Sequence, residues 1–254
     1  MRNFLSSLFG SKRELKQLSE PVALGGLYCD MHSHFIPGVD DGAATMEDSI
    51  ALIKGMHSLG YKKLITTPHI YWDLYKNNSA ILLERLERVR AELLRQEIDI
   101  ALDVAAEYFC DEHFEELIEK RDILSFGDQK YVLLEISFMD ENVNLPRALF
   151  NLRLAGYRPV LAHPERYEYW HRKFSQYEKY FDQEIIFQLN INSLTGQYGP
   201  GVRRISERLI DKGMIQFLGS DCHHVGHLNL MDTARKSPHL KKLIDSGMLL
   251  NATL

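Results

Sequence analysis

Residues 28–42 read YCDMHSHFIPGVDDG, and this stretch decides the fold class. It opens with a strand candidate, Tyr28 to His32, and runs directly into histidines and an acidic pair. A helix candidate follows over residues 45–59, because Thr45 and Asp48 have capping-box spacing and Gly60 stands just past its end. A buried strand, a polar strand end and a helix together form the repeating unit of parallel α/β folds.

The same unit recurs along the chain. Further short apolar runs, expected to be buried parallel strands, cover residues 63–67, 98–106, 131–136, 159–162, 185–189 and 215–218. Further helices are expected over residues 79–96, 112–120, 146–156, 173–181, 202–212 and, interrupted at Pro238, 232–246. In the first of these, Leu83, Leu86 and Leu93 are expected to share one face. Seven such units predict a single-domain α/β fold, a closed or nearly closed TIM-like (βα)7 barrel, with a doubly wound open sheet as the alternative.

Composition restricts the class of protein. The chain has 254 residues, 45% hydrophobic and 26% charged, which is typical of a globular domain and excludes a disordered chain. No apolar run reaches the roughly 18 residues of a membrane-spanning helix. The net charge of -5 argues against nonspecific nucleic-acid binding, so no nucleic-acid partner is expected. The three cysteines are widely spaced and favour a reducing, cytoplasmic compartment, and none begins the Cys-x5-Arg signature of thiolate phosphatases.

Residues 1–27 are predicted to form an N-terminal extension to a domain at residues 28–254. Apolar residues at positions 4, 5, 8 and 9 form i, i+4 pairs, and basic residues follow. Two interpretations stay open. The segment is either a flexible tail or a short amphipathic helix that contacts a membrane surface or a partner through residues 1–16.

Polar side chains of metal-ligand type follow six of the seven strands. In a barrel these strand ends meet at one rim, where active sites are built. Only the sixth strand departs, with Asn190-Ile191-Asn192. The candidate ligands are His32, His34, Asp41, His69, Glu107, Glu135, His163, Asp221 and His223.

Local spacing supports the ligand assignment. In extended chain alternate residues face the same way, so His32 and His34 can point at one metal, and Asp221 and His223 can do the same while Cys222 points elsewhere. The two aspartates before Gly42, Asp40 and Asp41, suit either an Asx-type turn or a site where one of them reaches a further metal. Nine ligands suit two or three ions at about three protein ligands per catalytic metal.

Clustered divalent cations favour phosphoester hydrolysis, because they offset phosphate charge and activate water. Arg166, just beyond His163, suits either a phosphate-binding guanidinium or an ordinary surface arginine. Tyr71, Trp72 and Tyr75 follow His69 on the same rim. They are either a packed loop or one wall of a pocket for an aromatic substrate.

The order of these motifs resembles the PHP (polymerase and histidinol phosphatase) family over about residues 28 to 230. Within it the chain is most similar to the CpsB/CapC-type bacterial tyrosine phosphatases of capsule and exopolysaccharide loci. The motifs that carry the resemblance are His32-x-His34, Asp40-Asp41-Gly42, Thr67-Pro68-His69, Glu107, Glu135, His163-x-x-Arg166 and Asp221-x-His223.

The resemblance implies a distorted (βα)7 TIM-like barrel, the PHP fold, with a trinuclear site that often holds manganese, iron and zinc being the alternatives. It assigns His32, His34, Glu107 and Asp221 to one metal, Glu107, Glu135 and His163 to a second, and Asp41, His69 and His223 to a third. It makes Arg166, Asp221 and His223 catalytic, with Arg166 binding phosphate and a metal-activated hydroxide attacking phosphorus without a phosphoenzyme. The implied substrate is the phosphotyrosine tail of a membrane-associated bacterial tyrosine kinase that controls capsule or exopolysaccharide synthesis.

The sequence departs from the family pattern after the last ligand, and three other functional classes are alternatives to the tyrosine phosphatase. Family members often carry a second phosphate-binding arginine after the last ligand, but residues 224–228 read HVGHL, where a protonated His227 is the candidate substitute. Another PHP phosphoesterase, such as a histidinol-phosphate phosphatase, would share the metal set. Glu135 and Asn190 stand where a metal-dependent amidohydrolase carries lysine and histidine, which counts against that class. A nonenzymatic relic barrel is disfavoured because unligated carboxylates facing one another repel.

Overall fold

Neighbouring strands of both sheets run parallel in the computed structural model, which describes residues 18–254. The smaller sheet has the order β1 (Cys29–Asp30), β2 (Lys63–Thr66), β4 (Ala101–Val104). The larger sheet has the order β3 (His69–Ile70), β5 (Glu107–Phe109), β6 (Tyr131–Glu135), β7 (Arg158–Ala162), β8 (Ile186–Asn190), β9 (Phe217–Gly219).

The two sheets are halves of one barrel. Only Thr67 and Pro68 lie between β2 and β3, and the backbone pairing continues across them, since the Ala105 N–H donates to Thr66 O (2.9 Å) and the Glu107 N–H donates to Pro68 O (3.1 Å). The sequence therefore located the second and third strands but did not predict that each is divided in two.

The barrel closes between its first and last strands at the rim that carries the histidines. There the Asp221 N–H donates to His32 O (2.8 Å), the His34 N–H donates to Cys222 O (3.1 Å), and Ser33 and Cys222 form a parallel bridge. The prediction of a closed or nearly closed seven-unit barrel is confirmed, and the open-sheet alternative is wrong.

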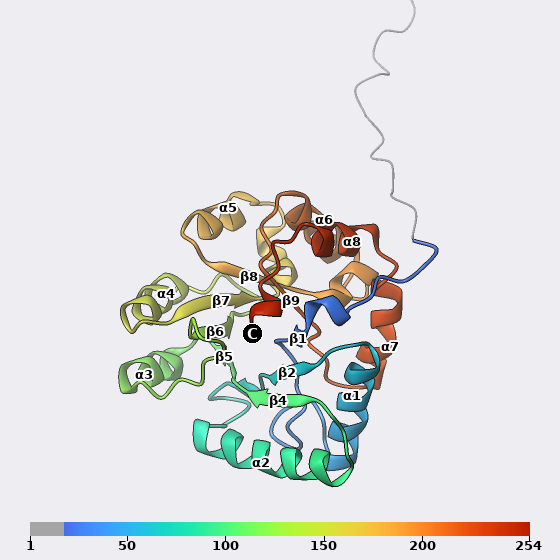
Figure 1. The fold of residues 1–254 in the computed structure, drawn as a ribbon. Helices are drawn as coiled ribbons and strands as arrows, with labels where there is room; N and C mark the ends of the chain where they lie inside the picture. The colour runs from blue at the N-terminus through green and yellow to red at the C-terminus, as the bar shows by residue number, and fades with distance from the viewer. Residues whose placement is uncertain (1–17) are drawn as a thin grey trace, which may run out of the picture.

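At the opposite end, side chains complete the closure. Asn251 in η5 (Asn251–Thr253) accepts from the Leu218 N–H (3.0 Å) and donates to Cys29 O (2.9 Å) and Leu218 O (2.7 Å). Between the two ends, both oxygens of buried Asp30 accept from Ser220, at 2.8 Å each. Figure 1 accordingly shows the C-terminal end lying close to β1 and β9.

Helices surround the strands (Figure 1). They are α1 (Met46–Ser58), α2 (Ser79–Arg95), α3 (Glu112–Lys120), α4 (Leu145–Leu154), α5 (Ser175–Asp182), α6 (Pro200–Asp211), α7 (Val225–Ala234) and α8 (Pro238–Asp245). The capping box of Thr45 and Asp48 is formed, and Asn78 caps α2. Among residues 18–254, none of these helices combines the length and apolar character needed to cross a bilayer.

Strand residues alternate between two apolar layers. In β6, Val132 and Leu134 pack in the large cluster beneath the helices, whereas Leu133 belongs to a second cluster with Val160 and Phe217 from other strands. The second cluster fills the inside of the curled sheet, as side-chain layers do in barrels of this kind.

Two expectations need correction. Leu83 is 46% exposed, because the buried face of α2 follows a 4-3-4 spacing through Leu82, Leu86, Val89 and Leu93. The segment expected as one interrupted helix over 232–246 is two helices, the first of which starts earlier, at Val225.

The chain immediately before residue 28 also contacts the barrel. Leu24 is fully buried next to η1 (Gly25–Leu27), and the Val22 N–H donates to Arg235 O (2.8 Å). Residues 18–27 are thus packed on the barrel. The amphipathic segment expected at residues 1–16 lies outside the described residues.

Candidate metal centre

Strand ends from both halves of the barrel bring imidazoles and carboxylates together. Donor atoms lying within 4.8 Å of one another form three groups: His32, His34, Glu107 and Asp221; His34, Asp41, His69 and His223; and His69, Glu107 and Glu135. The groups overlap, because His34, His69 and Glu107 each belong to two of them. Eight of the nine predicted ligands fall into these groups, and the ninth, His163, lies beside them.

The first group is fully enclosed by protein. The His32 Nε2 atom lies 3.1 Å from Glu107 Oε2 and 3.4 Å from Asp221 Oδ1. The His34 Nε2 atom lies 3.4 Å from the same Asp221 oxygen and 3.5 Å from Glu107 Oε2. All four side chains are buried, so two imidazole nitrogens and two carboxylate oxygens face one small volume.

The second group opens toward solvent. Asp41 Oδ1 lies 3.4 Å from His223 Nε2 and 3.6 Å from His69 Nε2, and the Asp41 side chain is 53% exposed. The His34 and His223 rings stack with centroids 3.9 Å apart. Asp41 therefore points into the cluster, as the metal-ligand interpretation expected.

The third group differs in one member from the expected set. His69 Nδ1 lies 3.3 Å from both Glu107 Oε2 and Glu135 Oε1, and takes the place expected for His163. His163 Nε2 is still 3.0 Å from Glu107 Oε1 and 3.9 Å from Glu135 Oε2. The two histidines thus flank the same pair of glutamates.

Two polar side chains hold the ligand histidines from behind. His32 Nδ1 hydrogen-bonds Gln188 Oε1 (2.9 Å), and that oxygen also accepts from the His163 N–H (3.1 Å). His34 Nδ1 hydrogen-bonds Asp40 Oδ2 (2.8 Å), which also accepts from the His69 N–H (3.1 Å). With Nδ1 engaged as donor, Nε2 of each ring is left to face the cluster, as in metal-binding histidines.

Asp221 is held in the same way. Its Oδ2 accepts from Asn190 Nδ2 (2.7 Å) and Arg166 Nη1 (3.1 Å), so Oδ1 faces His32 and His34. The backbone at Asp221 has φ 48°, in the left-handed region that non-glycine residues rarely adopt. The extended-chain argument was therefore wrong for Asp221 in geometry, although the side chain reaches the expected place. Strain of this kind is typical of functional sites.

The buried imidazoles and carboxylates shift one another's pKa values. Burial alone would lower the pKa of His34, but the carboxylates of Asp40 and Asp221 hold that pKa well above its usual value. Burial would raise the pKa of Asp221, but the nearby imidazoles of His32 and His223 hold it well below its usual range. Because histidine must lose its proton to bind a metal, cation binding here would displace protons from these rings.

The donor set fits divalent cations. Buried His69 Nδ1 makes no hydrogen bond, although two carboxylate oxygens lie 3.3 Å away. Nitrogen and oxygen donors without thiolate suit manganese, iron or zinc. Cys222 is buried in the core and belongs to none of the groups, as expected.

Arg166 lies at the edge of the cluster between two aromatic rings. Its guanidinium carbon is 4.5 Å from the ring centroid of Phe138 and 4.5 Å from that of Tyr198. Phe138 is 40% exposed, and its ring lies 5.6 Å from that of His163. The guanidinium has five donors, and its contact with Asp221 uses one nitrogen, which leaves the others for a ligand.

The aromatic loop after His69 is mostly packed against the protein. Tyr71 stacks on Phe109 (3.9 Å between centroids) and Tyr75 stacks on His69 (5.3 Å). Trp72 remains 51% exposed, with its ring 4.5 Å from His113. Tyr71 and Tyr75 are half-buried by these contacts, and Trp72 is the most exposed of the three aromatic rings.

His227 is a poor substitute for an arginine near pH 7. Burial, and then the neighbouring His224, lower the pKa of His227 to about 4. Its Nδ1 atom lies 3.2 Å from the carbonyl oxygen of Asp221. The charged form that the expected role needs is therefore not the one present at neutral pH.

Sequence reasoning missed several supporting residues: Gln188, Asn190, Phe138 and Tyr198, and the orienting role of Asp40. A signal existed for two of them, because Gln188 and Asn190 alternate as polar residues on an otherwise apolar strand and so share one face. Phe138 and Tyr198 lie in connecting segments, where spacing gives no such signal.

Comparison with known proteins places these features in one family. The family model "Capsular polysaccharide synthesis, CpsB/CapC" matches residues 28–245. The tyrosine-protein phosphatase YwqE of Bacillus subtilis is 31% identical over 196 residues, 77% of either chain. The tyrosine-protein phosphatase CpsB of Streptococcus agalactiae is 23% identical over 201 residues, 77% of this chain and 83% of the relative.

A solved structure supports the same relation. A chain from the crystal structures of Bacillus subtilis YwqE and Streptococcus pneumoniae CpsB, described as metal-dependent tyrosine phosphatases, superposes with a TM-score of 0.77. Sequence identity is 28%, and the match covers 89% of this chain and 94% of the other.

Proposed function

This chain belongs to the CpsB/CapC capsular polysaccharide synthesis family, and on that premise we propose that it is a metal-dependent protein tyrosine phosphatase. The observation that carries the proposal is the three overlapping donor groups beside Arg166. Its relatives YwqE and CpsB are named tyrosine-protein phosphatases, and the superposed structures are described as metal-dependent.

The proposal assigns two or three divalent cations, manganese first, to the cluster. His32, His34, Glu107 and Asp221 hold one ion. His69, Glu107 and Glu135, with His163 beside them, hold a second. Asp41 and His223, with His69, would hold a third. Bound there, such ions offset phosphate charge and make water a stronger nucleophile.

The chain's own residues position the substrate. Arg166 binds phosphate oxygens with the donors that Asp221 does not use, and its place between Phe138 and Tyr198 restricts its motion. Asp221, held by Asn190, keeps one oxygen toward the cluster and the other toward Arg166. A phenolate is a better leaving group than an alkoxide, so a site without a dedicated general acid favours aryl esters.

The proposed physiological substrate is the phosphotyrosine-bearing tail of a membrane-associated bacterial tyrosine kinase, met in the cytoplasm. The family's link to capsular polysaccharide synthesis supports the substrate. A reducing compartment is supported by Cys29, Cys110 and Cys222, which are all buried and free.

Chelation followed by readdition of single metals tests the proposal. The chelated protein is expected to lose hydrolysis of a phosphotyrosine peptide, and manganese to restore it more fully than iron or zinc. Rates are compared on matched phosphotyrosine and phosphoserine peptides and on histidinol phosphate. Preference for histidinol phosphate would assign the chain to another PHP phosphoesterase class, and full activity at one metal per chain would overturn the multinuclear centre.

A further inference from the structure

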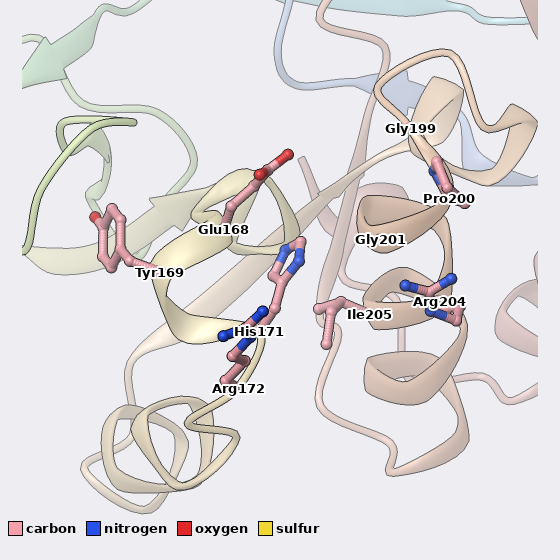
Figure 2. Close-up of a pocket in the computed structure, with 9 residues that line it drawn as sticks. All are labelled: Glu168, Tyr169, His171, Arg172, Gly199, Pro200, Gly201, Arg204 and Ile205. Atoms are coloured by element: carbon pink, nitrogen blue, oxygen red, sulfur yellow. The ribbon is translucent and has the colours of Figure 1, made fainter.

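A pocket of about 680 Å³ lies outside the metal centre, between η3 (Glu168–Trp170) and the start of α6 (Figure 2). One wall carries His171 and Arg172, and the other carries Gly201 and Arg204. None of these residues belongs to the donor groups, and the proposed mechanism uses none of them.

The pocket lies on the same rim as the metal centre. Its two walls follow the carboxyl ends of β7 and β8, the ends that face the active rim in barrels. The walls continue the segments that meet where Arg166 contacts Tyr198 at 4.5 Å. Glu168 and Pro200 each stand two residues beyond that contact, a separation of at most about 7 Å.

Positive charge dominates this pocket. Arg172 and Arg204 are both exposed, and among residues 18–254 neither forms an ion pair with a carboxylate. Arg203, the next residue on the same helix, differs because it pairs with Glu207 at 2.9 Å. Two guanidinium groups that line one pocket and have no carboxylate partner favour the binding of an anion.

His171 lies on one wall and approaches the other closely. Its Nε2 atom hydrogen-bonds the carbonyl oxygen of Glu165 (2.8 Å), which fixes the ring. A side chain at Gly201 would place its Cβ 3.2 Å from His171 Nδ1, so glycine lets the ring approach α6 closely. Glu168 is the pocket's one lining carboxylate, and Figure 2 shows it at the opposite end of the wall from Arg172.

We propose that this pocket binds an anionic side chain of the substrate peptide, about one to three residues from the phosphotyrosine, between Arg172 and Arg204. The inference rests on the proposed phosphatase function and deepens it by naming a substrate class, acidic phosphotyrosine peptides. A carboxylate and a second phosphate share the required chemistry, and both suit planar guanidinium donors.

The test compares kcat/KM on three phosphotyrosine peptides that differ only near the phosphotyrosine, where they carry glutamate, glutamine or a second phosphotyrosine. Wild type is expected to prefer one or both anionic peptides over the glutamine peptide by about 5–10-fold, mainly through KM. A preference for glutamate identifies a carboxylate as the ligand, and a preference confined to the second phosphotyrosine identifies phosphate.

The double variant R172A/R204A is expected to lose the preference while hydrolysing p-nitrophenyl phosphate at the wild-type rate. R172K/R204K should retain part of it, and Glu168→Gln should increase it. R203A is the matched control, since it removes one positive charge from the same helix outside the pocket.

Three results would overturn the subsite. The first is an equal kcat/KM of the wild type on all three peptides. A loss of preference in R203A as large as in R172A/R204A would show general attraction rather than a site. A loss of p-nitrophenyl phosphate hydrolysis in R172A/R204A would place the arginines at the reaction centre. Failure of wild type on every phosphotyrosine peptide would instead refute the proposed function itself, and the subsite with it.

Discussion

The buried half of the metal centre and the exposed surface around it differ in what fixes their side chains. His32, His34, Glu107 and Asp221 have at most 2% of their surface exposed, and strand ends place them. Phe138 and Trp72 lie on connecting segments and are 40% and 51% exposed. The first set offers nitrogen and oxygen donors for cations, and the second offers apolar faces. The candidate ligands thus lie at strand ends and the exposed aromatic faces on connecting segments, a division of roles that is common in barrel enzymes.

The largest expected effect is the loss of activity when a buried metal ligand is removed. Asp221→Asn and His34→Ala are each expected to lower kcat by more than about 100-fold, because removing a ligand should exceed the 10–100-fold cost of losing an outer partner. Phosphotyrosine-peptide kinetics and metal stoichiometry measure the effect. Asp73→Asn, in the exposed loop, is the matched control and should keep its activity. Activity within tenfold of wild type in either ligand variant would contradict the assignment.

A smaller loss of metal affinity is expected at Asp40, which hydrogen-bonds the ligand His34. Its two oxygens accept from His34, His69 and the Gly42 N–H, which an asparagine cannot all satisfy because one of its oxygens becomes an NH₂ donor. Asp40→Asn should weaken metal binding by about 10–100-fold while excess metal restores part of the activity. Metal titration followed by activity measures both. Unchanged metal affinity would show that Asp40 does not orient His34.

The difference between the two regions also explains what the sequence predicts. The ligands at strand ends could be predicted, because parallel strands bring their carboxyl ends to one rim whatever the loops do. The exchange of His163 for His69 in one group could not, because spacing along the chain predicts neither the left-handed backbone at His163 (φ 31°) nor the division of β2 from β3. Phe138 and Tyr198 could not be predicted either, since their positions beside Arg166 are set by loop packing across the barrel.

Arg166 lies on the border of the two regions, with 25% of its side chain exposed. Arg166→Ala is expected to raise KM for a phosphotyrosine peptide about tenfold, the lower part of the range for hydrogen bonds to charged groups. A parallel fall in kcat would show that the arginine binds the transition state more tightly than the ground state. Arg166→Lys should recover little, because it lacks the planar fork. Metal content is measured alongside, and a loss of metal without a change in KM would make Arg166 a support for Asp221 only.

The smallest expected effect concerns the exposed aromatic residues. Phe138 and Trp72 are the two candidates for the surface that contacts the substrate ring. Phe138 lies 4.5 Å from the Arg166 guanidinium and 5.6 Å from the His163 ring, so a phosphate held there brings its phenyl group toward Phe138. Trp72 lies instead against His113 and Lys76. An aromatic pair contributes about 0.5–1.5 kcal/mol beyond burial, so Phe138→Ala should lower kcat/KM on phosphotyrosine peptides about 2–10-fold and leave phosphoserine peptides unchanged. Trp72→Ala, the matched control, should change neither by more than about twofold. The reverse pattern would return substrate recognition to the loop after His69, and equal losses on both peptides would mean that Phe138 acts by holding Arg166 rather than by contacting the ring.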